Sequence, residues 1–425
     1  MKVMWLSHPP KKLVKELGFP GMATGGWVDG LAEKLTSYYY DECELIFVFL
    51  NRYNDKEFRG KIDLGGGEFE YIGIPVNPAN QSIESRFSEL FAEIKPDILH
   101  VFGTENPNYF KIVKTFNNPD RTITALQGLA EIYGRHIPDG IPERVVRGKT
   151  LRDIIRGDSI LKWQRNFYKA GKIERQAVEY CKNFFGRTDF DHAFVKQINP
   201  DCNYFHCGEI LRGEFYSSEK LWSYENCDKH SLFTSQAHYT LKGLHFLIEA
   251  MGILAKKYPD IKLHVGGHTI RVIPKNFKDY MCQCSYARYC WSLVKKYNLQ
   301  DKITFTGVMD TNTMLQQFLK SHVYVCPSTM ENSPNSLCEA KLLAMPCVAS
   351  DVGGISNLMK HKEDGYMYPV NEPYMLAYYI DEIFEMKERA AELGQKAREN
   401  ILKLVDPKTN TDRTIEVYRQ LIAGI

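Results

Sequence analysis

The sequence predicts an α/β protein built on two mainly parallel β-sheets, and three observations lead to that prediction. Short apolar runs alternate with longer stretches of helical periodicity along all 425 residues. Several of these runs end in Gly, Ser or Thr, as expected where a buried strand opens into a loop. At roughly 150 residues per domain, the length suits two large or three small domains. We therefore expect two Rossmann-like domains facing each other across a cleft.

The apolar runs place the strands in two series. In the first half we expect strands at Lys2–Ser7, Leu45–Leu50, Phe69–Ile74, Ile98–Gly103, Thr122–Gln127, Asn183–Thr188 and Cys202–His206. In the second half we expect strands at Ser231–Thr234, Lys262–Gly266, Ile303–Gly307, Val323–Pro327, Cys347–Ser350 and Gly365–Tyr368. A polar stretch without clear period separates the two series, so we place the domains at residues 1–207 and 208–402, with a last helix within 403–425.

Composition excludes several classes of protein. Lys and Arg total 54 against 52 Asp and Glu, a formal charge of +2, whereas a nucleic-acid coat is strongly basic. Eleven scattered cysteines indicate reduced thiols rather than a disulfide scaffold. No apolar run approaches the ~18 residues that a membrane-spanning helix needs. These features predict a cytoplasmic location.

The most informative segment follows the strand that ends at Pro327. It carries Glu331 in a loop, then Ser333 and Pro334 at the predicted start of a helix, and Glu339 within that helix. The first turn of a helix has free backbone amides at a positive dipole end, which together favour a phosphate group. We expect those amides to be the ones of Asn335, Ser336 and Leu337.

This segment resembles the signature of the retaining GT-B glycosyltransferases of family 4 type. In that family two Glu are separated by seven residues and followed by Glu-Ala, a Pro-led strand and a Gly-Gly turn. The chain has Glu331, Glu339-Ala340, Pro346 and Gly353-Gly354. The resemblance implies the GT-B architecture, a donor sugar contact for Glu331 and ribose hydroxyl contacts for Glu339. A carboxylate can accept from both hydroxyls of a vicinal diol, which suits the second role.

Upstream, Leu241-Lys242-Gly243 is similar to a Lys-Gly step of the same family, whose Lys neutralises the leaving diphosphate. Preorganised positive charge at the leaving group is electrostatic catalysis. The family also places an Arg before that Lys, and this chain has Thr234-Ser235-Gln236-Ala237-His238 instead. Either another basic group, such as His238 or Arg271, completes the diphosphate site, or Lys242 and the helix amides suffice.

The first half offers weaker candidates. Gly25-Gly26 precedes a helical pattern, and the family uses such a turn near the donor diphosphate. The family's acceptor-side His is absent at the strand end Leu126-Gln127, so Gln127 and the later His136 are the candidates there. Arg187 lies at the end of another predicted strand and is a candidate for the acceptor side. The resemblance also implies that the final helix returns to the first domain.

We predict no metal site. Asp189-x-Asp191 could be read as a metal-binding acid pair, but the Gly-Arg-Thr step before it favours a helix start. Cys282, Cys284 and Cys290 lack the spacing of common zinc sites. We therefore expect the diphosphate charge to be handled by Lys242 and the helix amides.

A basic segment spans residues 144–172. It holds nine Lys and Arg against Asp153 and Asp158, with aliphatic and aromatic residues interleaved. Such a segment can lie on an anionic membrane. A solvated helical hairpin that covers the sheet is the equally weighted alternative.

The resulting hypothesis is a retaining, metal-independent hexosyltransferase with no cofactor. It would use a nucleotide diphosphate sugar, with UDP-sugar expected over GDP-sugar, and a carbohydrate or lipid-linked acceptor, in cell-surface glycan or glycolipid synthesis. Two alternatives are a glycan phosphorylase of similar fold and a non-catalytic nucleotide-sugar-binding partner subunit, the latter suggested by the missing Arg and His. The balanced charge disfavours a nucleic-acid partner.

Overall fold

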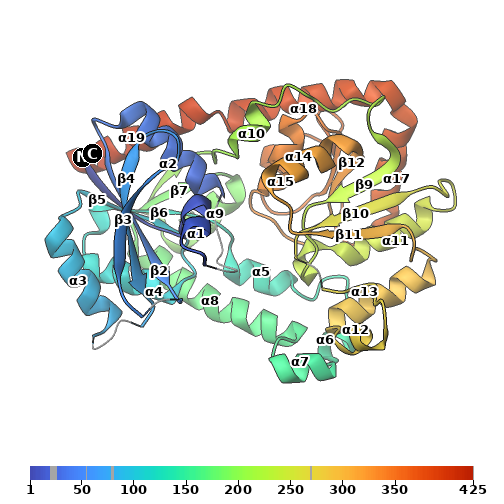
Figure 1. Cartoon of the computed structure of the whole chain (residues 1–425), viewed down its shortest axis with the longest axis horizontal. Coiled ribbons are helices and arrows are strands. Elements are labelled where there is room, and N and C mark those ends of the chain that lie inside the picture. The colour runs from blue at the N-terminus through green and yellow to red at the C-terminus, as the bar shows by residue number, and fades with distance from the viewer. Residues whose placement is uncertain (20–25, 54, 78–80, 269, 425) are drawn as a thin grey trace. The chain divides into compact units, whose positions relative to one another are not determined.

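A computed structural model describes residues 1–19, 26–53, 55–77, 81–268 and 270–424. The chain divides into two compact units (Figure 1). Unit 1 consists of residues 1–130, 170–212 and 405–425, and unit 2 consists of residues 131–169 and 213–404. Each unit is built around its own sheet.

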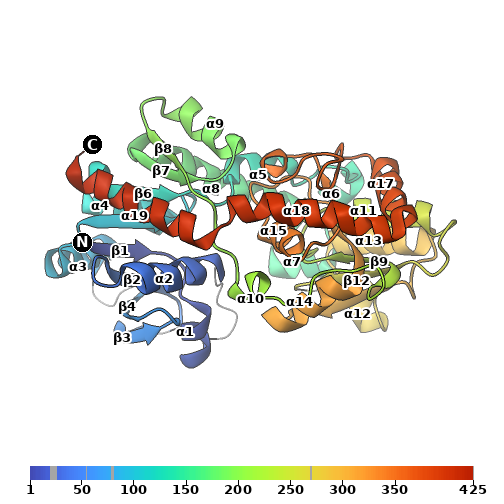
Figure 2. The same ribbon diagram turned by 90° about the horizontal axis from the view of Figure 1, so that it is seen from above.

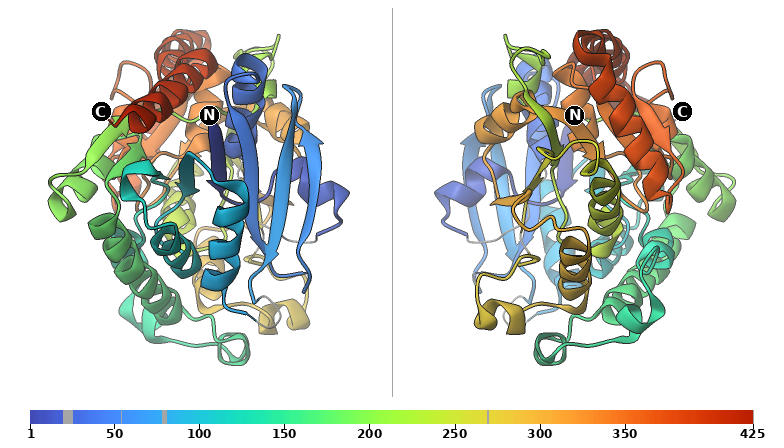
Figure 3. Two further views of the ribbon diagram at one scale, coloured as in Figure 1. Left: turned by 90° about the vertical axis from the view of Figure 1, so that its left-hand side faces the viewer. Right: turned by 90° about the vertical axis from the view of Figure 1, so that its right-hand side faces the viewer.

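Unit 1 holds an eight-stranded sheet in the order β3-β4-β2-β1-β5-β6-β7-β8, in which every pair is parallel except β3 with β4. Its strands are β1 (Lys2–Leu6), β2 (Glu44–Asn51), β3 (Phe58–Asp63), β4 (Glu68–Pro75), β5 (Ile98–Phe102), β6 (Thr122–Ala125), β7 (Asn183–Gly186) and β8 (Asn203–His206). Its helices include α1 (Lys11–Glu16), α2 (Gly26–Tyr39), α3 (Ile83–Ile94), α4 (Pro107–Phe116), η1 (Pro119–Arg121), α9 (Asp189–Ile198) and α19 (Pro407–Ala423). Figure 3 shows the twist of this sheet.

Helices cover both faces of this sheet, because its parallel strands are apolar on both sides. On one face α2 and α19 pack with Trp5 and Phe47, and Figure 2 shows α19 beside α2. On the other face α3 and α4 pack with Met4 and Val48. The indole Nε1 of Trp5 donates to the hydroxyl of Tyr418 over 3.0 Å, which anchors the last helix to the central strand.

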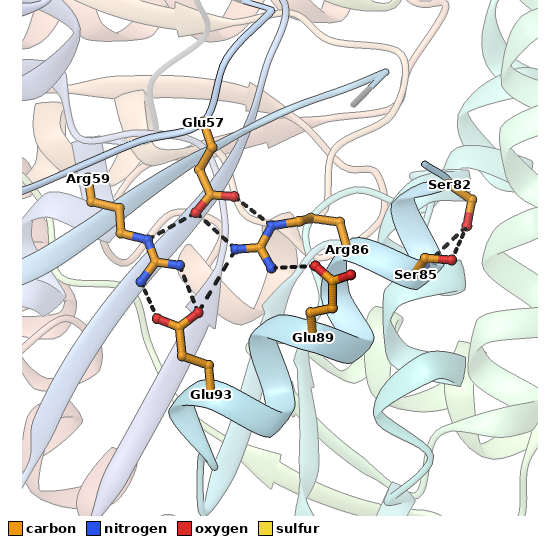
Figure 4. Close-up of polar contacts among 7 residues, drawn as sticks. All are labelled: Glu57, Arg59, Ser82, Ser85, Arg86, Glu89 and Glu93. Atoms are coloured by element: carbon orange, nitrogen blue, oxygen red, sulfur yellow. Dashed lines mark hydrogen bonds and ion pairs between the residues drawn. The ribbon is translucent and has the colours of Figure 1, made fainter. Parts of the chain in front are cut away.

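The edge strand β3 is the one strand that the apolar runs did not predict. Its outward positions carry Arg59, Lys61 and Asp63, so its sequence is too polar to stand out. Figure 4 shows how this edge is tied to α3: Arg59 pairs with Glu57 and with Glu93, and Arg86 donates to Glu57 over 2.6 Å. Charged edge strands resist pairing with other chains.

Unit 2 holds a six-stranded, wholly parallel sheet in the order β11-β10-β9-β12-β13-β14. Its strands are β9 (Asp228–Thr234), β10 (Lys262–Gly266), β11 (Ile303–Gly307), β12 (Ser321–Cys326), β13 (Cys347–Ser350) and β14 (Tyr366–Tyr368). Its helices include α10 (Gly213–Tyr216), η2 (Thr240–Lys242), α11 (Leu244–Leu254), α12 (Phe277–Met281), α13 (Ser285–Lys296), α14 (Thr311–Lys320), α15 (Asn335–Leu342), α16 (Ile355–Leu358), α17 (Pro373–Met386), η3 (Lys387–Arg389) and α18 (Ala390–Leu404).

Four helices occupy the segment between β6 and β7, most of which belongs to unit 2. They are α5 (Ala130–His136), α6 (Glu143–Arg147), α7 (Leu151–Arg156) and α8 (Ile160–Tyr180). The sequence placed all of residues 1–207 in the first domain, whereas residues 131–169 group with unit 2. The reason is that this segment makes its contacts on unit 2, as with the buried carboxylate of Asp153, which accepts from the Ser285 amide over 2.9 Å.

The α/β class with two Rossmann-like sheets is confirmed. Every strand that the apolar runs predicted is present, with bounds shifted by a few residues. The Gly65–Gly67 run lies in the turn between β3 and β4, as expected for a loop. Within the part of the chain that the structure describes, no helix combines the length and apolar character needed to cross a bilayer.

Candidate active site

A buried ion pair between Lys242 and Glu331 forms the centre of the candidate site in unit 2. The ammonium Nζ lies 2.6 Å from Oε1 of Glu331, and the side chains are 18% and 9% exposed. The hydroxyl of Ser328 donates to the same carboxylate oxygen over 2.7 Å. An ammonium has three N–H donors, and this ion pair uses one of them. The pair can therefore hold its geometry and still donate to a bound anion.

Glycine at position 243 allows Lys242 to reach this place. Lys242 ends η2, and Gly243 follows with φ +64°, in the left-handed region that favours glycine. A Cβ at Gly243 would lie 1.8 Å from the carbonyl oxygen of Pro327, so a side chain there would push η2 away from the end of β12. The Lys-Gly step therefore has a steric as well as a chemical basis.

Three hydrogen bonds brace the loop that carries Glu331. The amide of Thr329 donates to the Leu241 carbonyl over 2.8 Å. The hydroxyl of Ser350, at the end of β13, donates to the Ser328 carbonyl over 2.5 Å. The amide of Gly354 donates to the backbone carbonyl of Glu331 over 3.1 Å.

The Gly353-Gly354 turn packs directly against Glu331. Gly353 has φ +54°, and a Cβ on it would lie 1.9 Å from the Glu331 carbonyl oxygen. The turn that the sequence marked as a motif therefore serves to place the backbone of the acid. Gly353 and Gly354 therefore both contact the backbone of Glu331 and help to fix its position.

Helix α5 contributes two further contacts. The hydroxyl of Tyr133 accepts from the Asn332 amide over 3.1 Å, and the His136 carbonyl accepts from the Thr329 hydroxyl over 3.2 Å. The His136 ring itself pairs with Asp139, with Nδ1 2.6 Å from Oδ2. His136, predicted on the acceptor side, is thus held in unit 2, where its backbone supports the loop that carries Glu331.

The electrostatics leave Lys242 as a cation, and leave His238 and Tyr133 neutral. Burial lowers the pKa of Lys242, but Glu331 and Tyr239 raise it more, so it lies well above its ordinary value. Burial and the positive charge of Lys242 lower the pKa of His238 to about 4. Burial and the carboxylate of Glu331 raise the pKa of Tyr133, which stays a neutral phenol. His238 is therefore uncharged at neutral pH and cannot replace a missing Arg.

Helix α15 begins later than the sequence suggested. It starts at Asn335, with Pro334 rather than Ser333 at the N-cap position and no side-chain cap. The amide of Leu337 donates to the Pro334 carbonyl over 3.0 Å, so the prediction of a free Leu337 amide is wrong. The cause is a tight first turn, in which an N–H reaches the carbonyl three residues back.

The other donor-side candidates on α15 are placed as follows. The Ser336 hydroxyl accepts from the hydroxyl of Tyr324 over 2.7 Å, at the carboxyl end of β12. The Tyr324 hydroxyl also lies 3.3 Å from that of Ser235, which follows β9. Glu339 lies within the helix and is 4% exposed. These groups gather where two neighbouring strands end.

In unit 1, Arg187 and Gln127 line a narrow cavity of about 40 Å³. Arg187 pairs with the buried Glu209, and its guanidinium donates to the carbonyls of Leu126 and Gln127 over 2.6 and 3.1 Å. A cavity of that size holds a few water molecules at about 10–15 Å³ each. The structure therefore uses Arg187 to fix the loop after β6.

The remaining predictions for the first half concern the glycine turn and the helix after β7. Gly26 is the first residue of α2, and Gly25 lies outside the described residues. Asp189 begins α9, and Asp191 closes a capping box with Thr188, in agreement with a helix start.

Arg271, the other basic candidate for the diphosphate, pairs with Asp279 and lines a different pocket, beside Arg152. Among the described residues, no three His, Cys, Asp or Glu side chains are grouped to hold a metal ion.

Sequence reasoning missed three residues of this site: Tyr133, Ser328 and Tyr324. Ser328 directly follows a predicted strand, so its position alone could have singled it out, whereas Tyr324 lies within that strand. Tyr133 lies nearly 200 positions from Asn332, and nothing local in the sequence predicts that they meet.

Comparison with known proteins matches the second half of the chain to a sequence family. Residues 224–400 match the family model described as Glycosyl transferases group 1. An uncharacterised glycosyltransferase of Haemophilus influenzae is 26% identical over 185 residues, which cover 43% of this chain and 46% of that protein. The D-inositol 3-phosphate glycosyltransferase of Paenarthrobacter aurescens is 25% identical over 196 residues, 46% of this chain and 45% of that protein. The chain thus spans about half the length of the curated relatives it matches.

Solved structures match over the whole chain at low identity. Sucrose-phosphate synthase from Thermosynechococcus elongatus has a TM-score of 0.69 at 18% identity and covers 100% of both chains. HepE from Anabaena, solved in complex with UDP, has a TM-score of 0.63 at 13% identity and covers 99% of this chain and 100% of that one. TarM from Staphylococcus aureus, solved with UDP among its ligands, has a TM-score of 0.64 at 13% identity and covers 98% of this chain and 99% of that one. The fold is therefore GT-B.

Proposed function

We propose that this protein is a retaining glycosyltransferase that moves a sugar from a nucleotide diphosphate donor to a hydroxyl acceptor without a metal ion. The observation that carries the proposal is the Lys242–Glu331 pair, fixed by a braced loop inside the matched segment 224–400. Fixed charges act on a reaction best when no reorganisation is needed as the charge develops. The pair meets that requirement before any donor binds.

We assign Lys242 to the diphosphate. Its ammonium stays charged because Glu331 holds its pKa high, and it has N–H donors beyond the one that Glu331 accepts. As the bond from the sugar to the diphosphate breaks, negative charge grows on the leaving oxygen. Lys242 and the first amides of α15, those of Asn335 and Ser336, would stabilise that charge. His238 adds none, because it is neutral.

We assign the two acids to opposite ends of the donor. Glu331 would contact the donor sugar, since its second carboxylate oxygen can accept from a hydroxyl while the first pairs with Lys242. Glu339 would accept from the ribose hydroxyls. The leaving phosphate would take the proton of the acceptor hydroxyl, which needs no protein base and suits transfer with retention.

We propose a UDP-sugar as donor and a carbohydrate or lipid-linked acceptor, in cell-surface glycan or glycolipid synthesis. The support for UDP is that similar structures, HepE and TarM, were solved with UDP. Gln127, on the loop that Arg187 fixes, is the acceptor-side candidate in unit 1. The reaction would take place in the cytoplasm at the inner membrane surface, with residues 144–172 on anionic lipid.

Thermal unfolding against a panel of nucleotide sugars tests the donor assignment. A donor at about 100 times its Kd should stabilise the protein by about 2.7 kcal/mol, and Glu339→Gln should remove most of that shift. Glu382→Gln, an exposed acid of the same unit, is the matched control and should respond like wild type.

The products separate the alternatives. Transfer of the sugar to an acceptor with release of UDP supports the proposal. Release of a sugar phosphate in the presence of inorganic phosphate would instead show a phosphorylase. Donor binding without hydrolysis or transfer would show a non-catalytic binding subunit.

A further inference from the structure

Helix α7 (Leu151–Arg156) has the reverse of the usual distribution of side chains. Asp153 is 1% exposed, whereas Leu151, Ile154 and Ile155 are 57%, 65% and 75% exposed. Folded chains normally bury aliphatic side chains and leave carboxylates in water. Something other than water is therefore expected on the outer face of this helix.

The reversal is built in by hydrogen bonds. The Asp153 carboxylate accepts from the Thr150 amide over 3.1 Å and from the Ser285 amide over 2.9 Å, at the first turn of α13. A carboxylate is favourable at the amino end of a helix, and here it satisfies two buried N–H groups. Asp153 therefore fixes which face of α7 points outward, and Ile154 and Ile155 follow.

The short helix α12 continues the same surface. Leu151 and Ile155 line a pocket of about 500 Å³ together with Met281, the last residue of α12. Phe277 lies one helical turn before Met281 and is 77% exposed, the highest value among the exposed large apolar side chains of the described residues. Residues four apart share a helix face, so Phe277 extends this apolar area.

The rim of the pocket is cationic. Arg152, Arg156 and Arg271 line it. Residues 143–158 and 270–281, which contain α6, α7 and α12, hold eight Lys and Arg against four Asp and Glu, and one of those acids is the buried Asp153. The eight cations are Arg144, Arg147, Lys149, Arg152, Arg156, Arg271, Lys275 and Lys278.

We infer that this α7–α12 surface, made of Leu151, Ile154, Ile155, Phe277 and the surrounding cations, docks on an anionic lipid bilayer. Exposed aliphatic and aromatic side chains enter the boundary between head groups and acyl chains, while Arg and Lys pair with lipid phosphates. The charge excess favours lipid phosphates over a neutral apolar partner. The inference rests on the proposed membrane contact of residues 144–172 and narrows it to α7 and α12; it does not depend on sugar transfer.

Co-sedimentation of the whole chain with vesicles tests the inference. Wild type should bind vesicles that contain phosphatidylglycerol at low salt, and bind less at high salt and on pure phosphatidylcholine. The double variant Ile155→Asp/Phe277→Asp should lower the partition coefficient about tenfold or more, because it removes two inserted side chains. Arg156→Glu should lower it by about fivefold or more, because it removes one cation near the membrane surface and adds one anion there.

Val308→Asp is the matched control, since Val308 is 70% exposed in the same unit and lies at the end of β11. It should bind like wild type. Absence of wild-type binding to anionic vesicles at low salt would overturn the inference, as would equal binding by the double variant. A wild-type dimer that the double variant disperses would assign the surface to a second copy instead.

Sugar transfer is measured beside lipid binding with a water-soluble acceptor. A double variant that loses vesicle binding should keep this activity. If wild type binds vesicles but transfers no sugar, the proposed reaction is contradicted and the lipid inference stands.

Discussion

In each unit an ion pair of low exposure lies where a strand ends, and the two pairs differ in the partners of their cations. In unit 1, Arg187 and Glu209 are both 8% exposed, and the guanidinium also donates to two backbone carbonyls. In unit 2, Lys242 is 18% exposed, and its partner Glu331 sits in a loop held by backbone hydrogen bonds. The guanidinium of the first pair also donates to the backbone of the protein, whereas the ammonium of the second keeps N–H donors for a ligand.

This difference teaches how to read a charged pair in a sheet of this kind. A guanidinium that is committed to carbonyls fixes a loop, and its removal should cost stability. An ammonium that pairs with one carboxylate on a rigid loop is suited to act on a bound anion. Its removal should lower the rate of the chemical step. The predictions below separate the two cases.

The largest effect on stability is expected for Arg187→Met. Removing one partner of a buried pair leaves an uncompensated charge, here on Glu209, and costs about 3–5 kcal/mol. Hydrogen exchange of the β7 and β8 amides should report this loss locally in unit 1. The double variant Arg187→Met/Glu209→Leu should recover most of it, because both charges are gone. A double variant no more protected than the single one would contradict a structural role.

A smaller loss of stability, with a loss of rate, is expected for Gly353→Ala. The new Cβ would meet the Glu331 carbonyl, and φ +54° adds strain, together about 1–3 kcal/mol. Because the clash displaces Glu331, turnover should fall about tenfold or more. Gly307→Ala is the control: Gly307 has φ +77° with nothing within 4 Å of its Cβ, so only strain is added. Similar turnover in both variants would contradict the role of Gly353 in positioning Glu331.

The smallest effect concerns His238, whose folded pKa of about 4 lies below the ordinary 6.5. The unfolded chain binds the proton more readily, so stability falls as the pH drops from 6.5 towards 4. Between pH 7.5 and 5.5, wild type should lose about 1 kcal/mol more stability than His238→Gln. The variant still loses stability over this range, because burial also lowers the pKa of His100, His245 and His322. Because the charge of Lys242 helps to lower this pKa, Lys242→Ala should raise it in a histidine NMR titration. An unchanged His238 pKa in Lys242→Ala would contradict an electrostatic effect of Lys242 on His238.

Much of the site in unit 2 could be predicted from the sequence, because its residues lie close together along the chain. A strand, a loop acid, a Pro and a Gly-Gly turn follow one another between Pro327 and Gly354, and each has a local physical reason. The strands stood out for the same reason, since buried parallel strands are short apolar runs. The edge strand β3 escaped because its outward residues are charged.

What could not be predicted depends on contacts between distant positions. The approach of Tyr133 to Asn332 and the pairing of Arg187 with Glu209 arise from packing, not from spacing. The bounds of the units failed for the same reason: α7 belongs to unit 2 through the contact of Asp153 with Ser285. The start of α15 was also mispredicted, because it depends on one hydrogen bond, from the Leu337 amide to the Pro334 carbonyl.

The rate of a single turnover in Lys242→Ala tests the central claim most directly. With saturating nucleotide sugar, the chemical step should slow by about 10²–10³-fold, while the donor Kd changes far less. Lys262→Ala, at an exposed position in the same unit, should turn over like wild type. A near-wild-type rate in Lys242→Ala would contradict the assignment of the Lys242–Glu331 pair to the chemistry.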